Sequence, residues 1–453
     1  MSQTPEILWQ PSQEQIERTR LHDYMRWLAR HKGLEFADYH ALWEWSVHSL
    51  EAFWESIWQY FDVQAAVSYE RVLDGYDMPG AKWFEGSRLN LASQLFRFHA
   101  EEPERPAIIA RSELRLLTTL SWGELKRQVS QLAQALRRLG VQPGDRVVAY
   151  LPNLPETVVA FFACASIGAI WSSCSPDMGT RSVVDRFRQI DPKVLIAVDG
   201  YRYGGKDFDR RGVVEQLRAE LPTLQHVVLL PYLDPAARLP GAHLWTDLLQ
   251  GEAEIVIEQL PFDHPLWVVY SSGTTGLPKP IVHGHGGVLL ETLKGHALHM
   301  DLGPDDRFMW FTTTGWIMWN SQIGGLLVGS TICLYDGNPG HPDLETLWRF
   351  AGETAMTFFG AGAAYFLNCK KADIEPGKIA DLSRLRAVGF TGSPLPEEGF
   401  QWLSDKLGRH VLIAGISGGT DVAAAFVGSC PILPLYAGEM QCRGLGLAVY
   451  AMD

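Results

Sequence analysis

Apolar residues in the first 85 positions recur at helical spacing and include many aromatic side chains. Between residues 50 and 61 they are separated by three or four positions, which places them on one face of a helix. These residues are Leu50, Phe53, Trp54, Ile57 and Phe61. A stripe of this kind is typical of core packing rather than of a cofactor site. We therefore expect residues 1–95 to form a helical, aromatic-rich segment.

From about residue 100 the pattern changes to alternating strands and helices. Ser121 and Glu124 have the spacing of a capping box at the start of an amphipathic helix, and Gly140 marks its end. Helical spacing returns at 181–189 and 344–352. Short continuous apolar runs predict strands that are buried on both faces of a mainly parallel sheet. These runs are 146–151, 193–198, 226–230, 266–270, 331–335, 387–391 and 411–415. The expected fold class is α/β, with layered, mainly parallel sheets flanked by helices.

Length and composition narrow the class of protein. The 453 residues suggest more than one domain, and 46% hydrophobic with 20% charged residues is typical of a globular protein. A formal charge of −13 argues against general, nonspecific binding of nucleic acid. The longest uncharged apolar stretch, 158–171, contains Gly168 and is too short to span a membrane. The N-terminus does not resemble a signal peptide, so we expect a cytoplasmic protein with no membrane partner. Six scattered cysteines indicate reduced thiols and no structural metal.

Residues 271–279 stand apart from the rest of the chain. A strand pattern ends in a run of hydroxyl residues and glycines, which offers backbone N–H and side-chain O–H donors to phosphate oxygens. The segment consists of Ser271, Ser272, Gly273, Thr274, Thr275, Gly276, Leu277, Pro278 and Lys279. The glycine spacing differs from that of a P-loop. A simple turn between strands would explain the glycines but not the hydroxyls and the lysine, so the segment predicts a phosphate-binding loop.

This loop resembles the signature loop of the adenylate-forming superfamily, which includes acyl-CoA synthetases, luciferases and peptide-synthetase adenylation domains. Further matching segments follow in the expected order, at 151–156, 314–317, 391–394, 417–421 and 438–439. The aromatic-rich beginning and residues 83–90 resemble the acetyl-CoA synthetase branch. Residues 392–400 and 417–421 are most similar to members of that branch that activate acetoacetate. The resemblance extends over the whole chain, with residues 96–453 corresponding to an adenylation domain that includes a β-rich subdomain.

The resemblance implies an AMP-forming acid–thiol ligase. Such an enzyme joins ATP and a carboxylate into an acyl-adenylate with Mg²⁺, and the CoA thiol then displaces AMP. Small molecules (a short acid, ATP and CoA) would be its partners. The alternatives are a ligase for another short or branched acid and a non-catalytic adenylate-binding remnant. A phosphotransferase is disfavoured because neither a Walker sequence nor a kinase catalytic loop is present.

Residue roles follow from the resemblance position by position. Thr275, Lys279, Thr420 and Asp421 match catalytic positions, with Asp421 in place of a glutamate that ligates Mg²⁺. An alternative for Asp421 is a helix N-cap after the glycine turn. The matches to ATP- and AMP-binding positions are Ser271, Ser272, Gly273, Thr274, Thr275, Gly276, Lys279, Gly392, Ser393, Pro394, Gly415, Ile416, Ser417, Gly418, Gly419 and Thr420.

The acyl pocket is expected at Trp316, Ile317, Thr391 and Gly418. Gly418 stands where the acetate enzymes have a tryptophan that closes the pocket. Loss of an indole would leave room for an acid longer than acetate, such as acetoacetate. Alternatively, Gly418 is needed only to fit a tight backbone turn. For a 3-oxo oxygen, the candidate hydrogen-bonding residues are Asn320 and Ser417.

Two further groups of residues have open assignments. Arg202 and Lys206 match a basic loop that meets CoA in the acetate branch, although exposed basic residues are also common on ordinary surfaces. His283 and His285 follow the phosphate loop with one residue between them. We interpret them as structural or supporting residues, because two histidines without a third ligand seldom hold a metal.

The superfamily pattern continues beyond residue 453. The resemblance implies a further ribose-binding aspartate, a hinge and a small C-terminal domain that rotates between the two half-reactions. None of these is in the 453 residues. We therefore expect this chain to bind its ligands and to be impaired in turnover, unless a separate polypeptide supplies the rest.

Overall fold

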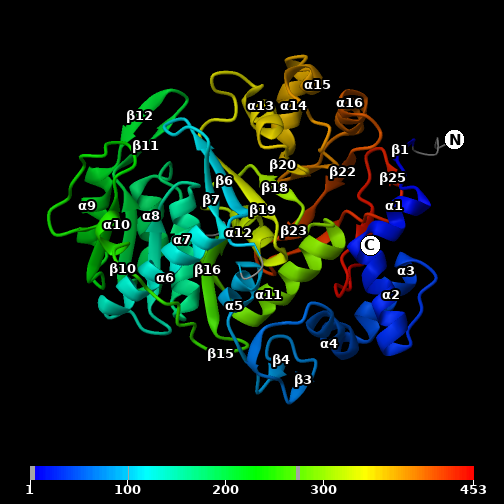
Figure 1. Ribbon diagram of the computed structural model, residues 1–453, viewed down its shortest axis with the longest axis horizontal. Coiled ribbons are helices and arrows are strands. Elements are labelled where there is room, and N and C mark those ends of the chain that lie inside the picture. Colours follow the sequence, from blue (N-terminus) through cyan, green and yellow to red (C-terminus); the bar gives the residue numbers. More distant parts are fainter. Residues whose placement is uncertain (1–5, 100–101, 272–275, 453) are drawn as a thin grey trace.

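Two seven-stranded sheets form the centre of the fold, with helices on their faces (Figure 1). The structure is a computed structural model, and it describes residues 6–99, 102–271 and 276–452. The first sheet contains, in spatial order, β14 (His243–Leu244), β13 (His226–Leu230), β10 (Val194–Val198), β8 (Arg146–Tyr150), β9 (Ile170–Cys174), β16 (Pro265–Ser271) and β17 (Lys279–Gly284). The second contains β22 (Leu412–Gly415), β21 (Ala387–Thr391), β20 (Phe358–Gly362), β18 (Arg307–Trp310), β19 (Thr331–Asp336), β6 (Pro106–Ser112) and β7 (Thr118–Ser121).

Neighbouring strands in both sheets are parallel, except at one edge of each. The edge strands β17 and β7 run antiparallel to β16 and β6. All seven strands expected from continuous apolar runs are present, as β8, β10, β13, β16, β19, β21 and β22. Parallel strands buried on both faces need apolar side chains at every position, which is why these runs are visible in the sequence.

Helices cover the sheets and also form the N-terminal segment (Figure 1). Their bounds are α1 (Gln13–Arg18), α2 (Arg20–Lys32), α3 (Tyr39–His48), α4 (Leu50–Tyr60), α5 (Leu91–Phe96), α6 (Trp122–Arg138), α7 (Pro155–Ser166), α8 (Thr180–Phe187), α9 (Arg211–Glu220), α10 (Trp245–Leu248), α11 (His285–Leu293), α12 (Ile317–Gly324), α13 (Thr346–Glu353), α14 (Ala363–Lys371), α15 (Pro376–Ile379) and α16 (Glu397–Leu407). The predicted cap of α6 is confirmed, since the Ser121 hydroxyl accepts from the N–H of Glu124 at 3.2 Å. Gly140 follows the helix with φ +79°.

The small sheets lie between and beside these layers. They pair β1 (Ile7–Trp9) with β25 (Leu435–Tyr436), β11 (Gly200–Tyr203) with β12 (Lys206–Asp209), and β3 (Arg71–Asp74) with β4 (Lys82–Glu85). Two three-stranded sheets contain β15 (Leu260–Pro261), β5 (Arg88–Leu89) and β2 (Ala65–Val67), and β23 (Ser417–Gly419), β24 (Ala424–Gly428) and β26 (Cys442–Arg443).

The expectation of a helical, aromatic-rich segment over 1–95 is correct for its first part and wrong for residues 65–89. Helices α1 to α4 end at Tyr60, and residues 65–89 contain the short strands β2 to β5. Aromatic and β-branched residues suit a half-buried strand as well as a helix, and their enrichment does not distinguish the two. The predicted stripe itself is correct, because Phe53 and Ile57 of α4 are fully buried.

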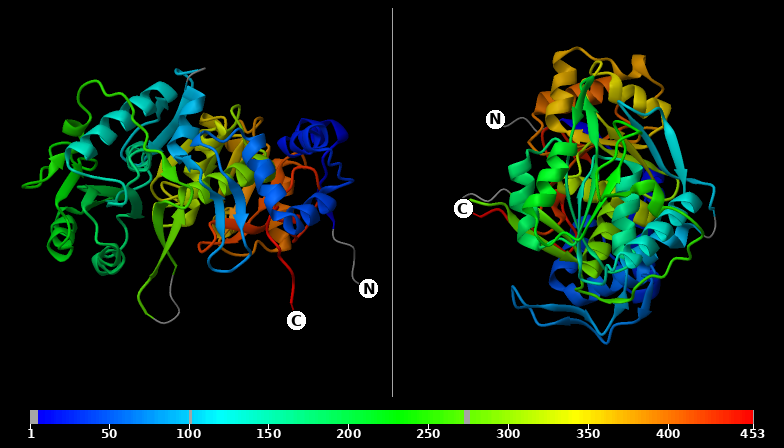
Figure 2. Two further views of the ribbon diagram at one scale, coloured as in Figure 1. Left: turned by 90° about the horizontal axis from the view of Figure 1, so that it is seen from below. Right: turned by 90° about the vertical axis from the view of Figure 1, so that its left-hand side faces the viewer.

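The N-terminal segment packs against the last residues of the chain. β1 pairs with β25, and the Trp43 indole donates to the carbonyl of Leu447 at 3.2 Å. Figure 2 shows both termini at the same end of the molecule. The Arg443 guanidinium also lies over the Trp43 ring, 3.3 Å from its centroid. Segments at opposite ends of the sequence therefore form one packed unit.

The long apolar stretch at 158–171 belongs to the core. Most of it is helix α7, whose residues from Thr157 onward are buried, and β9 follows after Gly168. In the part of the chain that the structure describes, no helix is long and apolar enough to cross a membrane. All six cysteines are free thiols, and five of them are buried.

Two hydroxyl groups connect the sheets where the parallel strands end. Thr314, just beyond β18 of the second sheet, donates its hydroxyl to the carbonyl of Leu151 in the segment after β8 at 2.6 Å. Ser173 of β9 donates to the carbonyl of Thr314 at 2.8 Å. The carboxyl ends of both sets of strands therefore meet, which is the usual place for a ligand site in such folds.

Candidate active site

The predicted phosphate loop joins two antiparallel strands. β16 ends at Ser271 and β17 begins at Lys279, and these two residues are cross-strand partners. Lys279 is exposed, and in the described ranges its ammonium has no ion-pair partner. Of the predicted loop residues between the two strands, Gly276 is exposed, whereas Ser272, Gly273, Thr274 and Thr275 lie outside the described residues. The hairpin thus holds the two ends of the loop side by side, with a free positive charge at one of them.

The residues expected around the nucleotide lie at the ends of neighbouring strands. Thr391 ends β21, and Gly415 ends the adjacent β22. The Thr391 hydroxyl donates to the carbonyl of Ile416 at 2.7 Å, which joins the two strand ends. Gly392 takes φ +89° and opens an exposed turn that continues through 393–394. The structure therefore brings two separate predicted segments to one edge of the second sheet.

The 417–421 segment forms a hairpin strand and a turn. β23 pairs antiparallel with β24, and residues 420–423 make the turn between them. Thr420 borders the cavity described below, whereas the Asp421 side chain is exposed. No helix begins at Asp421, because the chain continues into β24, so the N-cap alternative is wrong.

His283 connects the phosphate-loop hairpin to this turn. Its Nδ1 accepts from the Trp267 indole N–H at 2.8 Å. Its Nε2 therefore carries the proton, and it donates to the carbonyl of Asp421 at 2.8 Å. Burial lowers the pKa of His283, which favours this neutral form. The ring acts as a spacer between β16, β17 and the 420–423 turn.

His285 has a different environment. It is fully buried, and its Nδ1 accepts from the N–H of Leu91 at 3.3 Å. Burial lowers the pKa of His285 to about 3. The two histidines therefore make separate contacts within the protein. This agrees with their interpretation as structural or supporting residues.

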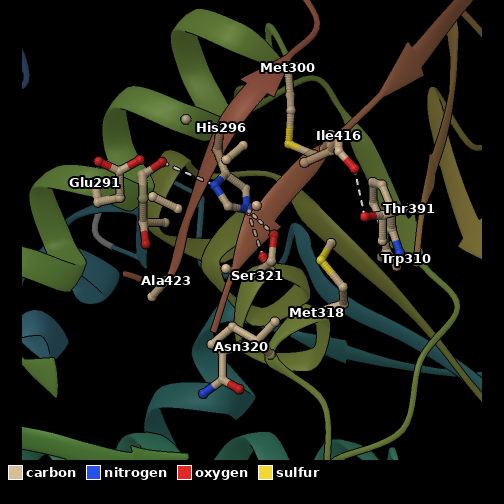
Figure 3. Close-up of a pocket in the computed structure, with 18 of the residues that line it drawn as sticks. Glu291, His296, Met300, Trp310, Met318, Asn320, Ser321, Thr391, Ile416 and Ala423 are labelled. Carbon is tan, nitrogen blue, oxygen red and sulfur yellow. Dashed lines mark hydrogen bonds between the residues drawn. The ribbon is translucent and has the colours of Figure 1, made fainter. Parts of the chain in front are cut away.

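A cavity of about 470 Å³ opens beside these segments. Its walls come from the strand ends at Trp310, Thr391 and Ile416, from α11 and α12, and from β24 (Figure 3). Met300, Met318 and Ile317 add apolar surface. A mostly apolar cavity with a few polar groups is typical of a small-molecule site. Of the predicted acyl-pocket residues, Trp316, Ile317, Thr391 and Gly418 all border it.

Sequence reasoning missed the polar residues on the α11 side of the cavity. Lys294 is 1% exposed and donates to the Glu291 carboxylate and to the carbonyl of Leu445, both at 2.8 Å. His296 is buried, with Nε2 2.7 Å from the carbonyl of Ser321. Burial lowers the pKa of His296. The available signal was the presence of charged and imidazole side chains in an otherwise apolar helix, followed by a π-helical turn at Lys294–His299.

The structure favours the second interpretation of Gly418. A Cβ added there would come within 2.2 Å of the carbonyl oxygen of Ala424, which is a backbone atom of the paired strand. Glycine is therefore required by the close approach of β23 and β24. The size of the cavity beside it cannot be ascribed simply to a missing indole.

The two candidates for a 3-oxo oxygen are placed differently. Asn320 is buried and borders the cavity, but its amide points away from Met318 and Ser321 (Figure 3). Ser417 is exposed and does not border the cavity. Neither side chain is directed at the apolar end of the site.

The predicted CoA residues lie on the β11–β12 hairpin, away from the cavity walls. Arg202 forms a bidentate pair with Asp207, with the shorter contact at 2.6 Å, and Lys206 is exposed. Glu113 accepts from the backbone N–H groups of Gly204 and Gly205 at 2.8 and 2.7 Å. The hairpin tip is therefore held in place, and Lys206 is its freer positive charge.

The donor set near the loop fits a cation that arrives with ATP. Among the described residues no cluster of three histidine, cysteine or acidic side chains could hold a metal alone. Asp421 presents an exposed carboxylate while its carbonyl is held by His283. Mg²⁺ is commonly bound by one or two carboxylates together with substrate phosphates. One exposed carboxylate, on a turn that is joined to the β16–β17 hairpin through His283, is compatible with that requirement.

Comparison with known proteins defines the class. Residues 95–439 match the family described as AMP-binding enzyme, and residues 39–95 match the acetyl-coenzyme A synthetase N-terminus. The chain belongs to the AMP-binding enzymes and has their adenylate-forming α/β fold.

Individual relatives define the family of the chain more closely. The chain is 43% identical to acetoacetyl-coenzyme A synthetase of Rhizobium meliloti (strain 1021), over 98% of this chain and 68% of that protein. It is 37% identical to acetoacetyl-CoA synthetase of Mus musculus, over 99% and 68%. Malonamoyl-CoA synthetase of Penicillium aethiopicum is 33% identical, over 98% and 66%. The solved acetoacetyl-CoA synthetase from Streptomyces lividans superposes with a TM-score of 0.95 at 50% identity, over 98% of this chain and 69% of that one.

Within the AMP-binding enzymes the chain therefore belongs to the acetoacetyl-CoA synthetase family. The members of this family are AMP-forming acid–CoA ligases. It spans about two thirds of the length of these relatives.

Proposed function

We propose that this chain activates acetoacetate with ATP and transfers the acyl group to CoA. In the first step a carboxylate oxygen attacks the α-phosphorus of ATP, which forms acetoacetyl-AMP and releases pyrophosphate. In the second step the CoA thiol attacks the acyl carbon, which forms acetoacetyl-CoA and releases AMP. The observation that supports this most strongly is the 50% identity and 0.95 TM-score shared with the Streptomyces lividans synthetase.

The chain's own residues supply positioning and charge. Lys279 at the end of the hairpin would neutralise phosphate charge, together with the hydroxyls of the 271–275 segment. Thr420 would contact the α-phosphate from the edge of the cavity. A bound Mg²⁺ would be held by Asp421 and would withdraw charge from the departing pyrophosphate. The turn at 392–394 would line the adenine ring.

The apolar end of the cavity suits the methyl end of a short acid. Ile317, Met318 and Met300 offer apolar contacts there, and the thioether chains adapt to small ligands. On the β11–β12 hairpin, Lys206 and Arg202 would meet the CoA phosphates. Arg202 is the weaker candidate of the two, because Asp207 already occupies its guanidinium.

A second acid has specific support. Malonamoyl-CoA synthetase is among the relatives, and malonamate has the shape of acetoacetate with an amide nitrogen in place of the methyl group. A ligase for malonamate or another short acid is therefore the alternative. A non-catalytic adenylate-binding protein is the other, and it would bind nucleotide without exchanging pyrophosphate.

Acid-dependent exchange of labelled pyrophosphate into ATP tests the proposal, because it reports adenylate formation without CoA. We expect acetoacetate to support the fastest exchange in a panel with malonamate, acetate, butyrate and isobutyrate. Fastest exchange with another acid would replace the substrate. Absence of exchange with every acid, together with measurable ATP binding, would favour the non-catalytic alternative.

A further inference from the structure

Trp310 forms part of the cavity wall and is held in one orientation. It ends β18, and its side chain is 1% exposed. A Cβ at Gly360 would come within 2.3 Å of the ring, and one at Gly389 within 2.6 Å. The neighbouring strands β20 and β21 therefore carry glycines at the two places where the indole lies against them. Any other residue there would push the ring out of its present position.

The edge of the indole that carries nitrogen is turned the other way. The atoms that lie against Gly360 and Gly389 belong to the benzo ring, on the side opposite Nε1. Trp310 lies beside Thr391 in Figure 3, and it lines the same cavity as Met318 and Ile416. The nitrogen-bearing edge is thus the edge that Gly360 and Gly389 leave uncovered.

The Trp310 N–H has no acceptor. In the ranges that the structure describes, Nε1 has no hydrogen-bond partner, yet it is not completely buried. For a buried residue that lines a cavity, the remaining accessible surface faces that cavity. Buried indole N–H groups usually have a partner, as the Trp267 N–H does in His283. A bound ligand would supply the missing acceptor.

The side chains nearest to Trp310 offer no other free hydrogen-bond donor. The Thr391 hydroxyl already donates to the carbonyl of Ile416. The side chains of Met300, Met318 and Ile317 offer no N–H or O–H group. A ligand oxygen at the apolar end of the cavity would therefore be expected to meet the Trp310 N–H.

We propose that the Trp310 N–H donates to the carbonyl oxygen at carbon 3 of the bound acid and thereby selects 3-oxo acids over saturated acids of equal length. This inference rests on the proposed function, because it uses the same cavity as the acyl site. Acetoacetate and malonamate both carry a carbonyl at this carbon, and butyrate does not. A donor-only group recognises that oxygen and leaves the terminal methyl or amide to other residues.

The test compares Trp310→Phe with the unchanged chain. The substitution removes the N–H and keeps an aromatic ring. Calorimetric titrations would use acetoacetyl-, malonamoyl- and butyryl-sulfamoyl adenosine, which resemble the acyl-adenylates and need no turnover. We expect the unchanged chain to bind the two 3-oxo analogues at least about tenfold more tightly than the butyryl analogue. Trp310→Phe should weaken both 3-oxo analogues about tenfold and change butyryl binding by less than about twofold.

A matched control is Trp348→Phe. Trp348 is also fully buried, and its Nε1 also has no partner in the described part of the chain, but it does not border the cavity. It should leave the preference unchanged. An unaltered preference in Trp310→Phe, or an equal loss in both variants, would overturn the inference.

Failure of the proposed function and failure of the variant to fold can both be distinguished from failure of the inference about Trp310. If the unchanged chain binds butyryl as tightly as acetoacetyl, or binds no analogue, the proposed function itself fails. If Trp310→Phe does not fold, the same comparison is made with β-(3-benzothienyl)alanine at position 310. That side chain keeps the ring shape and lacks the N–H, so its preference decides the inference.

Discussion

The Nε2 of His283 lies 2.8 Å from the carbonyl oxygen of Asp421 and donates its proton to it. Because the Trp267 indole donates to Nδ1, the tautomer of the ring is fixed by the structure. The contact connects the strand behind the phosphate loop to the turn that carries Thr420. The two predicted phosphate-binding segments are 138 residues apart along the chain at this contact, and one imidazole ring sets their separation.

Replacing His283 by alanine should therefore misalign the two segments. We expect the acid-dependent exchange rate at saturating ATP to fall about tenfold, since loss of orientation acts mainly on the chemical step. The KM for the acid should change less, because His283 does not border the cavity. The measurement is pyrophosphate exchange at varied acid and ATP. His48→Ala, at an exposed histidine, is the control. An unchanged maximal rate in His283→Ala would exclude a positioning role.

Lys279 gives a prediction about ATP alone. Lys279→Ala should raise the dissociation constant of ATP about tenfold or more, because a charge-assisted contact to phosphate is lost. Equilibrium binding of a fluorescent ATP analogue measures it. Lys371→Ala, which removes another exposed positive charge far along the chain, should leave the affinity unchanged. Equal affinity of Lys279→Ala and the unchanged chain would remove this residue from the phosphate site.

Gly418 gives a prediction about stability. Gly418→Ala places a methyl group against the Ala424 carbonyl, and we expect a loss of about 1–3 kcal/mol in the free energy of unfolding. Gly287→Ala is the matched control, because a Cβ there meets nothing within 4 Å on an exposed helical position. It should stabilise the chain by about 0.5–1 kcal/mol. Urea titration compares the two. Equal effects would show that Gly418 is not constrained by β24.

His285 gives a prediction about pH. Its pKa is about 3 in the folded chain and near its ordinary value of about 6.5 when unfolded. Below pH 6.5 the unfolded chain therefore takes up a proton that the folded chain does not, and stability falls as the pH falls. Between pH 7.5 and 5.5 this residue alone should account for a loss of about 1.4 kcal/mol.

His285→Asn removes that contribution while its amide oxygen can still accept from the N–H of Leu91. Urea titrations at the two pH values should show a loss smaller by about 1.4 kcal/mol in the variant. An identical loss in the variant and the unchanged chain would mean that His285 is not the group that titrates.

Much of the fold was visible in the sequence because local rules agree with the tertiary structure. Continuous apolar runs marked the central strands, and Ser121 marked the start of α6. Strand β9 was hidden, because the apolar run of α7 continues into it and only Gly168, with φ +72°, separates the two. The strands at 65–89 were hidden because aromatic residues suit both structures.

The candidate site residues also differ in how far the sequence could indicate them. Segments with unusual sequences, such as 271–279 and 417–421, could be proposed as site segments from the sequence, because backbone approach to a ligand would favour small and hydroxyl residues. Trp310, His296 and Lys294 were not found, because their sequence neighbourhoods are apolar and indicate core. Their place in the cavity wall depends on residues that are distant in the sequence. Gly418 was singled out in the sequence, but the reason that glycine is needed there, the close approach of Ala424 in the paired strand, became visible only in the structure.

The central claim is that these residues form an adenylate site selective for acetoacetate. Calorimetric titration of the unchanged chain with acetoacetyl-, acetyl- and butyryl-sulfamoyl adenosine tests it most directly, because binding requires the assembled site and not a full catalytic cycle. We expect the acetoacetyl analogue to bind most tightly. Binding of none of the three would contradict the adenylate site, and tightest binding of the acetyl analogue would contradict the choice of acid.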